Sequence, residues 1–350
     1  MKRVIAMVLA ALMVVSMTAC GNGANTPSGS AGGSGNAAGN EGGEKISIDF
    51  GYSLAEDTPT GKAASKFAEV ISELSGGNIT VNLYPSSQIG SEREMQEGCQ
   101  MGSVDMCIGG TATLVNFDKR WMVYDMPFVF SDYDAAYRSM DSQFGQDMLD
   151  SLADVNIKGL GFIDCGFTEI LNNHSELKVP ADIKGLNIRC MESIGYISTL
   201  KAFGVNPVQS ATSEVYNMVS NGTVDGTCNP VATFYTFSMY EIAKYMSRMY
   251  TWFTPVVMTM SMDLWNSLSP EYQEMVLKAS EEAVAYSREV RSDMEAGWLQ
   301  EMEDAGLIVT TYTDEERQVW IDYAEENLYP TLIPETIPQD LWDAFVNSAK

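Results

Sequence analysis

The residues of this sequence best suited to chemistry are a few charged and amide side chains rather than a catalytic set. Arg189 lies near the end of the short apolar segment LNIRC. A guanidinium buried there needs an anionic partner, because an unpaired buried charge is very costly. Its planar fork grips a carboxylate through two parallel hydrogen bonds. The segment alone is equally consistent with a partner Asp or Glu of the protein and with the carboxylate of a bound ligand.

Motifs of the common enzyme classes are missing from the sequence. It has no GxSxG elbow, no Walker A loop, no GxGxxG after a strand and no HExxH. His174 is the single histidine and stands in a polar run typical of an exposed loop, which leaves no basis for most catalytic triads or histidine-rich metal sites. We therefore expect a protein that is not an enzyme and that has no cofactor and no metal.

The N-terminus has the order of an export signal. Lys2 and Arg3 precede an apolar stretch at 4–17 that is too short for a standard membrane span, and Thr18 and Ala19 lead to Cys20. This order predicts a lipoprotein signal peptide at 1–20 with Cys20 as the lipidation site. Met17 is unusual in such a signal, so ordinary secretion is the alternative.

The next segment, 21–44, is dominated by Gly, Asn, Ser and Ala and predicts a flexible linker. Together with the signal it predicts an extracytoplasmic protein, lipid-anchored at the outer face of the cell membrane, or periplasmic. The formal net charge of −26 argues against nucleic acid as a partner and against direct adhesion to anionic lipid.

The remaining cysteines are interpreted as structural. With Cys20 assigned to lipid, an odd number remains and no CxxC occurs, so small buried hydrophobic side chains are a better interpretation than a disulfide framework. These cysteines are Cys99, Cys107, Cys165, Cys190 and Cys228.

The elements that must position Arg189 follow from the alternation of strand and helix patterns after residue 45. Segments such as ISIDFGY and ITVNLYP predict strands, and 3.6-residue apolar spacing between them predicts helices. Two such series, separated near residue 160, predict two doubly wound α/β domains with parallel sheets. Pro270 begins a helix expected to run to about residue 303 and to pack across both domains. A ligand cleft is expected between the domains.

Five blocks in a fixed order carry a resemblance to a known family. They are KFAEVISELSGGNITVNLYPSSQIGSEREMQEGCQMGSVDM, YDMPFVFSDYDAAYRSM, PADIKGLNIRCMES, LKAFGVNPV and SEVYNMVSNGTVDGTCNPVATFY. From about residue 46 to 300 the chain resembles the extracytoplasmic solute-binding subunit of tripartite ATP-independent periplasmic (TRAP) transporters. The resemblance implies a periplasmic-binding-protein-like fold with hinge strands and a long spanning helix, closing around one organic acid and docking on membrane permease subunits. It suggests domain I at 45–165 plus roughly 255–295, and domain II at 166–254 plus roughly 296–350.

The resemblance also implies roles for individual residues. The family's carboxylate-binding arginine corresponds to Arg189, and the polar residue of its Asp-Gly-x-x-Asn-Pro segment to Asn229. Glu92 and Arg93 lie in a segment where some members contact ligand hydroxyls, although a solvated helix start explains them as well. Phe234 is expected either in the wall of the cleft or in the core.

One departure from the family pattern bears on the ligand. Many members carry a second arginine about twenty residues before the first, and here that position falls on Thr168 or Glu169. A monocarboxylate with several hydroxyls, such as a sugar acid or hydroxy acid, suits Thr168, whereas a zwitterionic, amino-acid-like solute suits Glu169. The loss of the second cation disfavours a dicarboxylate.

The function indicated is therefore that of a solute-binding receptor of a TRAP-type uptake system. A sensory receptor of the same fold remains an alternative, since the binding protein itself would have the same sequence features. An enzyme using the cleft and a structural surface protein are further alternatives.

Overall fold

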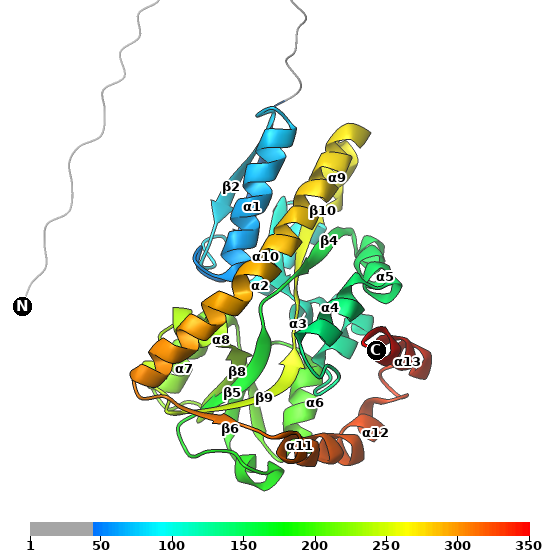
Figure 1. Cartoon of the computed structure of the whole chain (residues 1–350). Coiled ribbons are helices and arrows are strands. Elements are labelled where there is room, and N and C mark those ends of the chain that lie inside the picture. The colour runs from blue at the N-terminus through cyan, green and yellow to red at the C-terminus, as the bar shows by residue number, and fades with distance from the viewer. Residues whose placement is uncertain (1–44) are drawn as a thin grey trace, which may run out of the picture. The chain divides into compact units, whose positions relative to one another are not determined.

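The computed structural model describes residues 45–350, which contain two β-sheets flanked by helices (Figure 1). The first sheet has the strand order β2-β1-β3-β10-β4. Its strands are β1 (Ile46–Tyr52), β2 (Ile79–Tyr84), β3 (Met106–Gly110), β4 (Ile157–Ile163) and β10 (Val256–Ser261). The second sheet has the order β11-β9-β5-β8-β6-β7. Its strands are β5 (Phe167–Asn172), β6 (Asn187–Cys190), β7 (Asn206–Gln209), β8 (Gly226–Pro230), β9 (Tyr245–Phe253) and β11 (Ile308–Thr311).

Helices connect most of these strands. The α-helices are α1 (Pro59–Leu74), α2 (Glu92–Met101), α3 (Thr111–Leu114), α4 (Tyr133–Asp141), α5 (Gln143–Ser151), α6 (Ile194–Ala202), α7 (Val215–Ser220), α8 (Val231–Thr236), α9 (Met262–Ser267), α10 (Pro270–Asp304), α11 (Asp314–Asn327), α12 (Tyr329–Leu332) and α13 (Gln339–Ser348). Short 3-10 helices lie at Lys119–Asp125, Leu152–Val155, Pro180–Ile183, Thr212–Glu214 and Met239–Glu241. None of the helices described between residues 45 and 350 is both long and apolar enough to cross a membrane.

The two-domain α/β architecture is confirmed, but both sheets are mixed rather than parallel. β10 runs antiparallel to β3 and β4, and β5 runs antiparallel to β8 and β9. Each antiparallel strand enters its sheet directly from a strand of the other sheet. β5 comes three residues after β4 of the first sheet, and β10 comes two residues after β9 of the second. The expected separation of the two series near residue 160 falls inside β4, which forms an edge of the first sheet, so the second series begins with β5.

The long helix expected from Pro270 is present as α10 and crosses the molecule diagonally (Figure 1). Ser269 caps its start by accepting a hydrogen bond from the backbone N–H of Tyr272. Its first half packs in the same apolar cluster as α1 and the first sheet. In its second half, Trp298 stacks on Tyr235 of α8, with ring centroids 5.3 Å apart. α10 therefore packs on α1 beside the first sheet and on α8 beside the second.

Three segments connect the two sheets, and a partly buried ionic network lies beside them. The segments are residues 164–166, residues 254–255 and α10 itself. Arg291 of α10 has Nε 3.0 Å from Oδ2 of Asp164, and its Nη1 lies 3.5 Å from Oε2 of Glu295. Glu295 also pairs with Arg248 of β9. The network therefore ties α10 to residues 164–166 through Asp164 and to β9 through Arg248.

The strands of the first sheet fall within 45–165 and 255–295, and those of the second within 166–254 and 296–350. The C-terminal helix α13, however, packs against α4 and α5, which precede β4 in the chain. The exact division of the chain into two domains therefore stays a proposal.

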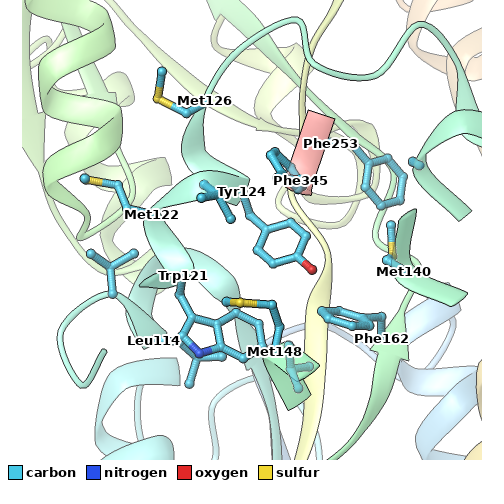
Figure 2. Packing of buried hydrophobic residues seen from close by; sticks show 14 of the residues in the cluster. Leu114, Trp121, Met122, Tyr124, Met126, Met140, Met148, Phe162, Phe253 and Phe345 are labelled. Carbon is cyan, nitrogen blue, oxygen red and sulfur yellow. The ribbon is translucent and has the colours of Figure 1, made fainter. Parts of the chain in front are cut away.

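An aromatic and methionine-rich cluster holds α13 in place (Figure 2). Phe345 is fully buried, and its ring lies edge-on to Tyr124 at 5.1 Å and to Phe130 at 5.4 Å between centroids. Trp121 and Phe162 continue the same cluster toward β4. The last helix of the chain is thus part of the core rather than an appendage.

We expect Phe345→Ala to destabilise the protein by about 3–5 kcal/mol, because it removes a buried ring from a packed cluster. For a chain of this size the midpoint Tm should fall by on the order of 10 °C. Asn347→Ala, at an exposed position of the same helix, is the control and should leave Tm nearly unchanged. Thermal unfolding followed by circular dichroism measures both, and equal Tm values would show that α13 does not contribute to the core.

Candidate ligand-binding site

A cavity lies between the two sheets, next to the carboxyl ends of several strands. From the first sheet it is lined by Ser53, which follows β1, and by Glu92 at the start of α2. From the second it is lined by Arg189 of β6 and Asn229 of β8. The connecting segment contributes Cys165. This is the position at which open α/β sheets and paired domains hold small ligands.

Arg189 is only 1 % exposed, and neutral groups hold its guanidinium. Nε donates to Oγ of Ser210 at 3.3 Å, Nη1 donates to Oδ1 of Asn229 at 3.2 Å, and Nη2 donates to the carbonyl oxygen of Ser210. Within residues 45–350, no carboxylate lies within ion-pair distance of Arg189. The sequence left a protein carboxylate open as its partner, and the described part of the chain supplies none.

Arg189 has N–H donors to which residues 45–350 offer no acceptor. A guanidinium has five N–H donors, so these three bonds leave one N–H on each of Nη1 and Nη2. Burial lowers the pKa of Arg189, which means that desolvation of the cation is not fully offset by the groups around it. Two N–H groups on one edge of a guanidinium match the two oxygens of a carboxylate. The geometry therefore suits an anion entering from the cavity.

Asn229 orients the arginine and keeps a donor of its own. Its Oδ1 accepts from Arg189 and also from Oγ1 of Thr227 at 2.7 Å. An asparagine side chain has both a donor and an acceptor to offer a ligand. With the oxygen already engaged twice, the Nδ2 group is the part available to a bound molecule.

Glu92 faces the cavity from the first sheet, held at both oxygens. Oγ of Ser53 donates to Oε1 at 2.6 Å, and the backbone N–H of Gly110 donates to Oε2 at 3.0 Å. The capping box of Ser91 and Glu94 begins α2 at this residue and so fixes where the carboxylate emerges. A carboxylate in this position can still accept hydrogen bonds from a ligand's hydroxyl or ammonium group.

The structure distinguishes between the two candidates for the position of the family's second arginine. Thr168 lines the cavity, and its buried Oγ1 has no hydrogen-bond partner within the described residues. Glu169 points away and accepts from the backbone N–H groups of Met249 and Tyr250 at 2.9 and 3.2 Å. Neighbouring residues of a strand face opposite sides, so only one of the pair can reach the cavity.

Two further candidates lie outside the cavity lining. Arg93 is exposed and its Nε donates to Glu97 at 2.8 Å, one turn along α2. Phe234 is fully buried in an apolar cluster with Met302 and Leu307. Arg93 therefore fits the alternative of a solvated helix start, and Phe234 fits the alternative of a core position.

Sequence reasoning missed several polar groups of the lining. They are Ser53, Thr60, Thr113, Cys165, Ser210, Thr233 and Thr254. No motif marks them, but Ser53 and Ser210 each follow the last residue of a strand. A search for polar residues just after predicted strands would have found these two.

The fold and site define a class of protein with two α/β sheets and a cavity at the strand ends, into which both sheets contribute polar side chains. Comparison with known proteins identifies the family. Residues 50–331 match the family model of bacterial extracellular solute-binding protein, family 7. The chain belongs to this family, which confirms the resemblance to TRAP solute-binding subunits and the function of a solute-binding protein.

Three relatives illustrate the similarity. The C4-dicarboxylate-binding periplasmic protein DctP of Rhodobacter capsulatus is 32% identical over 289 residues, 82% of this chain and 85% of the relative. The sugar acid binding protein DctPAm of Advenella mimigardefordensis, in complex with galactonate, is 28% identical with a TM-score of 0.81, covering 87% of this chain and 99% of the other. A TRAP periplasmic solute binding protein of Polaromonas sp. JS666, bound to D-erythronate, is 26% identical with a TM-score of 0.82, covering 86% and 98%.

We expect Arg189→Met to leave the stability of the ligand-free protein unchanged or to raise it, because the change removes a desolvated charge at similar side-chain volume. Asn229→Ala is the matched comparison: it leaves a donor of Arg189 unpaired and should cost about 1–3 kcal/mol. Urea unfolding without ligand measures both free energies. Severe destabilisation by Arg189→Met would instead assign the arginine a structural role.

Burial raises the pKa of Glu169 to about 8, against the lowering effects of Arg248 and the two backbone N–H groups. An acid whose pKa is raised by folding stabilises the fold while protonated, so this contribution is complete below the ordinary value of 4.5 and is lost as pH rises to about 8. Glu169→Gln removes the ionisation at the expense of one backbone hydrogen bond. The variant should therefore be slightly less stable than the parent at pH 5, but should lose less stability between pH 5 and pH 9. Urea unfolding at a series of pH values measures both free energies, and the same dependence on pH in parent and variant would contradict the raised pKa of Glu169.

Proposed function

We propose that this receptor captures a monocarboxylate carrying several hydroxyls, such as a sugar acid or a hydroxy acid. The observation that carries the proposal is the fully buried guanidinium of Arg189 beside the cavity. Within residues 45–350, one N–H on each of its terminal nitrogens has no hydrogen-bond partner. A ligand carboxylate would accept a hydrogen bond from each of these two N–H groups. Asn229 would add its Nδ2 donor to the same end of the ligand.

Two other residues of the lining, one from each sheet, favour ligand hydroxyls over a second anion. Glu92 presents carboxylate oxygens, and Thr168 presents a buried hydroxyl where the family pattern places a second cation. A second ligand carboxylate would meet the like charge of Glu92 without a cationic partner in the lining. The galactonate and D-erythronate in two of the similar structures are hydroxylated monocarboxylates, in line with this preference. Other relatives are named for C4-dicarboxylates or hold succinate, so the preference rests on the lining of this cavity.

Capture would proceed by closure about the three connecting segments. Glu92 belongs to the first sheet and Arg189 to the second, so closure would bring polar groups onto the ligand from opposite sides. The closed form would then dock on the permease subunits of the transporter. We further propose that Cys20, which lies outside the described residues, anchors the protein to the outer face of the membrane through lipid, with 21–44 as the tether.

A zwitterionic, amino-acid-like solute is the second candidate, supported by Glu92. The sequence suggested Glu169 as the partner of an ammonium group, but the structure turns Glu169 away from the cavity. Glu92 lines the cavity and could accept from an ammonium group instead.

The direct test is thermal unfolding of the protein against sugar acids, hydroxy acids, dicarboxylates, amino acids and neutral sugars. A ligand at 100 times its dissociation constant adds about 2.7 kcal/mol, which raises Tm by several degrees. We expect the largest shift from a hydroxylated monocarboxylate and no shift from that ligand with Arg189→Met. Stabilisation only by neutral or cationic compounds would overturn the role of Arg189.

Glu92→Gln separates the two candidate ligand classes. The amide keeps one acceptor but loses the charge, so a hydroxylated acid should bind about tenfold more weakly or less, in line with one altered hydrogen bond. An ammonium ligand should lose considerably more affinity, because its counter-charge is gone. Isothermal titration of the best ligand with the parent and the variant measures the ratio.

A further inference from the structure

Two buried cysteines, eight residues apart in the chain, lie in direct contact and outside the cavity lining. Cys99 is on α2 and Cys107 is on β3, and their sulfur atoms are 3.6 Å apart. Both side chains are fully buried, packed with Met95 and with the partly buried Ile89 and Val104. The spacing of Cys99 and Cys107 matches no disulfide or metal motif, so the pair is not recognisable from the sequence.

We propose that Cys99 and Cys107 form a disulfide in the exported protein, joining α2 to β3. The family is extracellular, and disulfides form and persist outside the cytoplasm. A disulfide S–S bond measures about 2.05 Å, so the two sulfurs must approach by roughly 1.5 Å. The facing positions of the side chains on a packed helix and strand place the sulfurs at van der Waals contact before any bond is made.

The bond forms by thiol–disulfide exchange with an external disulfide, either a small molecule or an oxidised protein dithiol. The thiolate of one cysteine attacks the external disulfide and gives a mixed disulfide, releasing the first thiol. The second cysteine loses its proton to solvent and attacks the mixed disulfide. The S–S bond forms and the second thiol leaves, so the cysteine pair is oxidised by two electrons and the external disulfide is reduced by two.

Oxidation must come before α2 is fully packed. Contact with Cys107 and burial raise the pKa of Cys99, and neither sulfur is reachable from solvent in the folded protein. The reactive thiolate is therefore scarce in the native state. The bond is expected to form while the exported chain folds, and to resist reducing agents once folding is complete.

The disulfide would fix the helix that carries a ligand-site residue. Glu92, Gln96 and Cys99 lie on one face of α2, at a spacing of four and then three residues. Glu92 accepts from the N–H of Gly110 at 3.0 Å, and Nε2 of Gln96 donates to the carbonyl oxygen of Gly110 at 3.3 Å. The sulfur pair extends this contact between α2 and β3 away from the cavity, so it helps to hold the Glu92 carboxylate in place.

The remaining cysteines of the described chain are expected to stay as thiols. Cys190 and Cys228 lie on the neighbouring strands β6 and β8, and Cys165 lines the cavity. These three therefore serve as internal references for the pair.

Peptide mapping of the full chain, exported from a bacterial host and alkylated after denaturation without reductant, tests the proposal. No Lys or Arg separates the two cysteines, so trypsin releases both within residues 94–119. We expect this peptide to be unalkylated and to lack two hydrogen atoms, while the other three cysteines are alkylated. Cleavage before Asp105 should give two peptides that separate only after reduction.

Thermal stability provides the second measurement. The oxidised protein should have a Tm several degrees above that of protein refolded and kept in reductant. Cys99→Ala should abolish this difference, whereas Cys228→Ala, which also removes one buried thiol, should retain it. Alkylation of both Cys99 and Cys107 in freshly exported protein and again after refolding in a glutathione redox buffer would overturn the proposal, as would pairing of either with another cysteine. The outcome does not depend on which solute the cavity binds.

Discussion

The buried guanidinium of Arg189 is the constraint around which the site is organised. It lies on a four-residue strand between two neighbours, and neutral oxygens from Ser210 and Asn229 hold it without cancelling its charge. An isolated cation in such a place is tolerated only if the fold gains elsewhere or if an anion arrives. The protein therefore bears a desolvation cost in the empty state, and under the proposed function a ligand carboxylate would offset that cost on binding.

The first sheet contributes the opposite polarity. Glu92 is held at both oxygens, and the capping box of α2 determines where it stands. The first sheet thus adds the Glu92 carboxylate to the cavity, and the second adds the donor fork of Arg189 together with a second carboxylate, Glu192. Under the proposed function, a ligand with a single acid group and several hydroxyls would contact Arg189 and Glu92 together.

Much of this could be predicted from the sequence, because the decisive features were local. The apolar segment around Arg189 and the long amphipathic stretch after Pro270 were readable from burial cost and periodicity, and both were found where expected. The choice between Thr168 and Glu169 was not readable, because a shift of one residue exchanges the faces of a strand and only the pairing partners fix that register. β9 and β10, which lie on either side of residues 254–255, were missed because their residues are mostly buried and show no clean alternation. The contact of Cys99 with Cys107 depends on how a helix docks on a strand, which no spacing rule encodes.

The order of strands also has a consequence for how the protein is made. The first sheet is completed only by β10 and the second only by β11, although their other strands begin some two hundred and some one hundred and forty residues earlier in the chain. A chain that crosses the membrane from its N-terminus therefore emerges with two incomplete sheets, and neither can close until residues near 261 and 311 have followed. Such distant pairings make folding slow and leave strand edges exposed in the meantime. Export and folding of this receptor are thus coupled through its topology, and the interval between them is a period in which the chain depends on protection from aggregation.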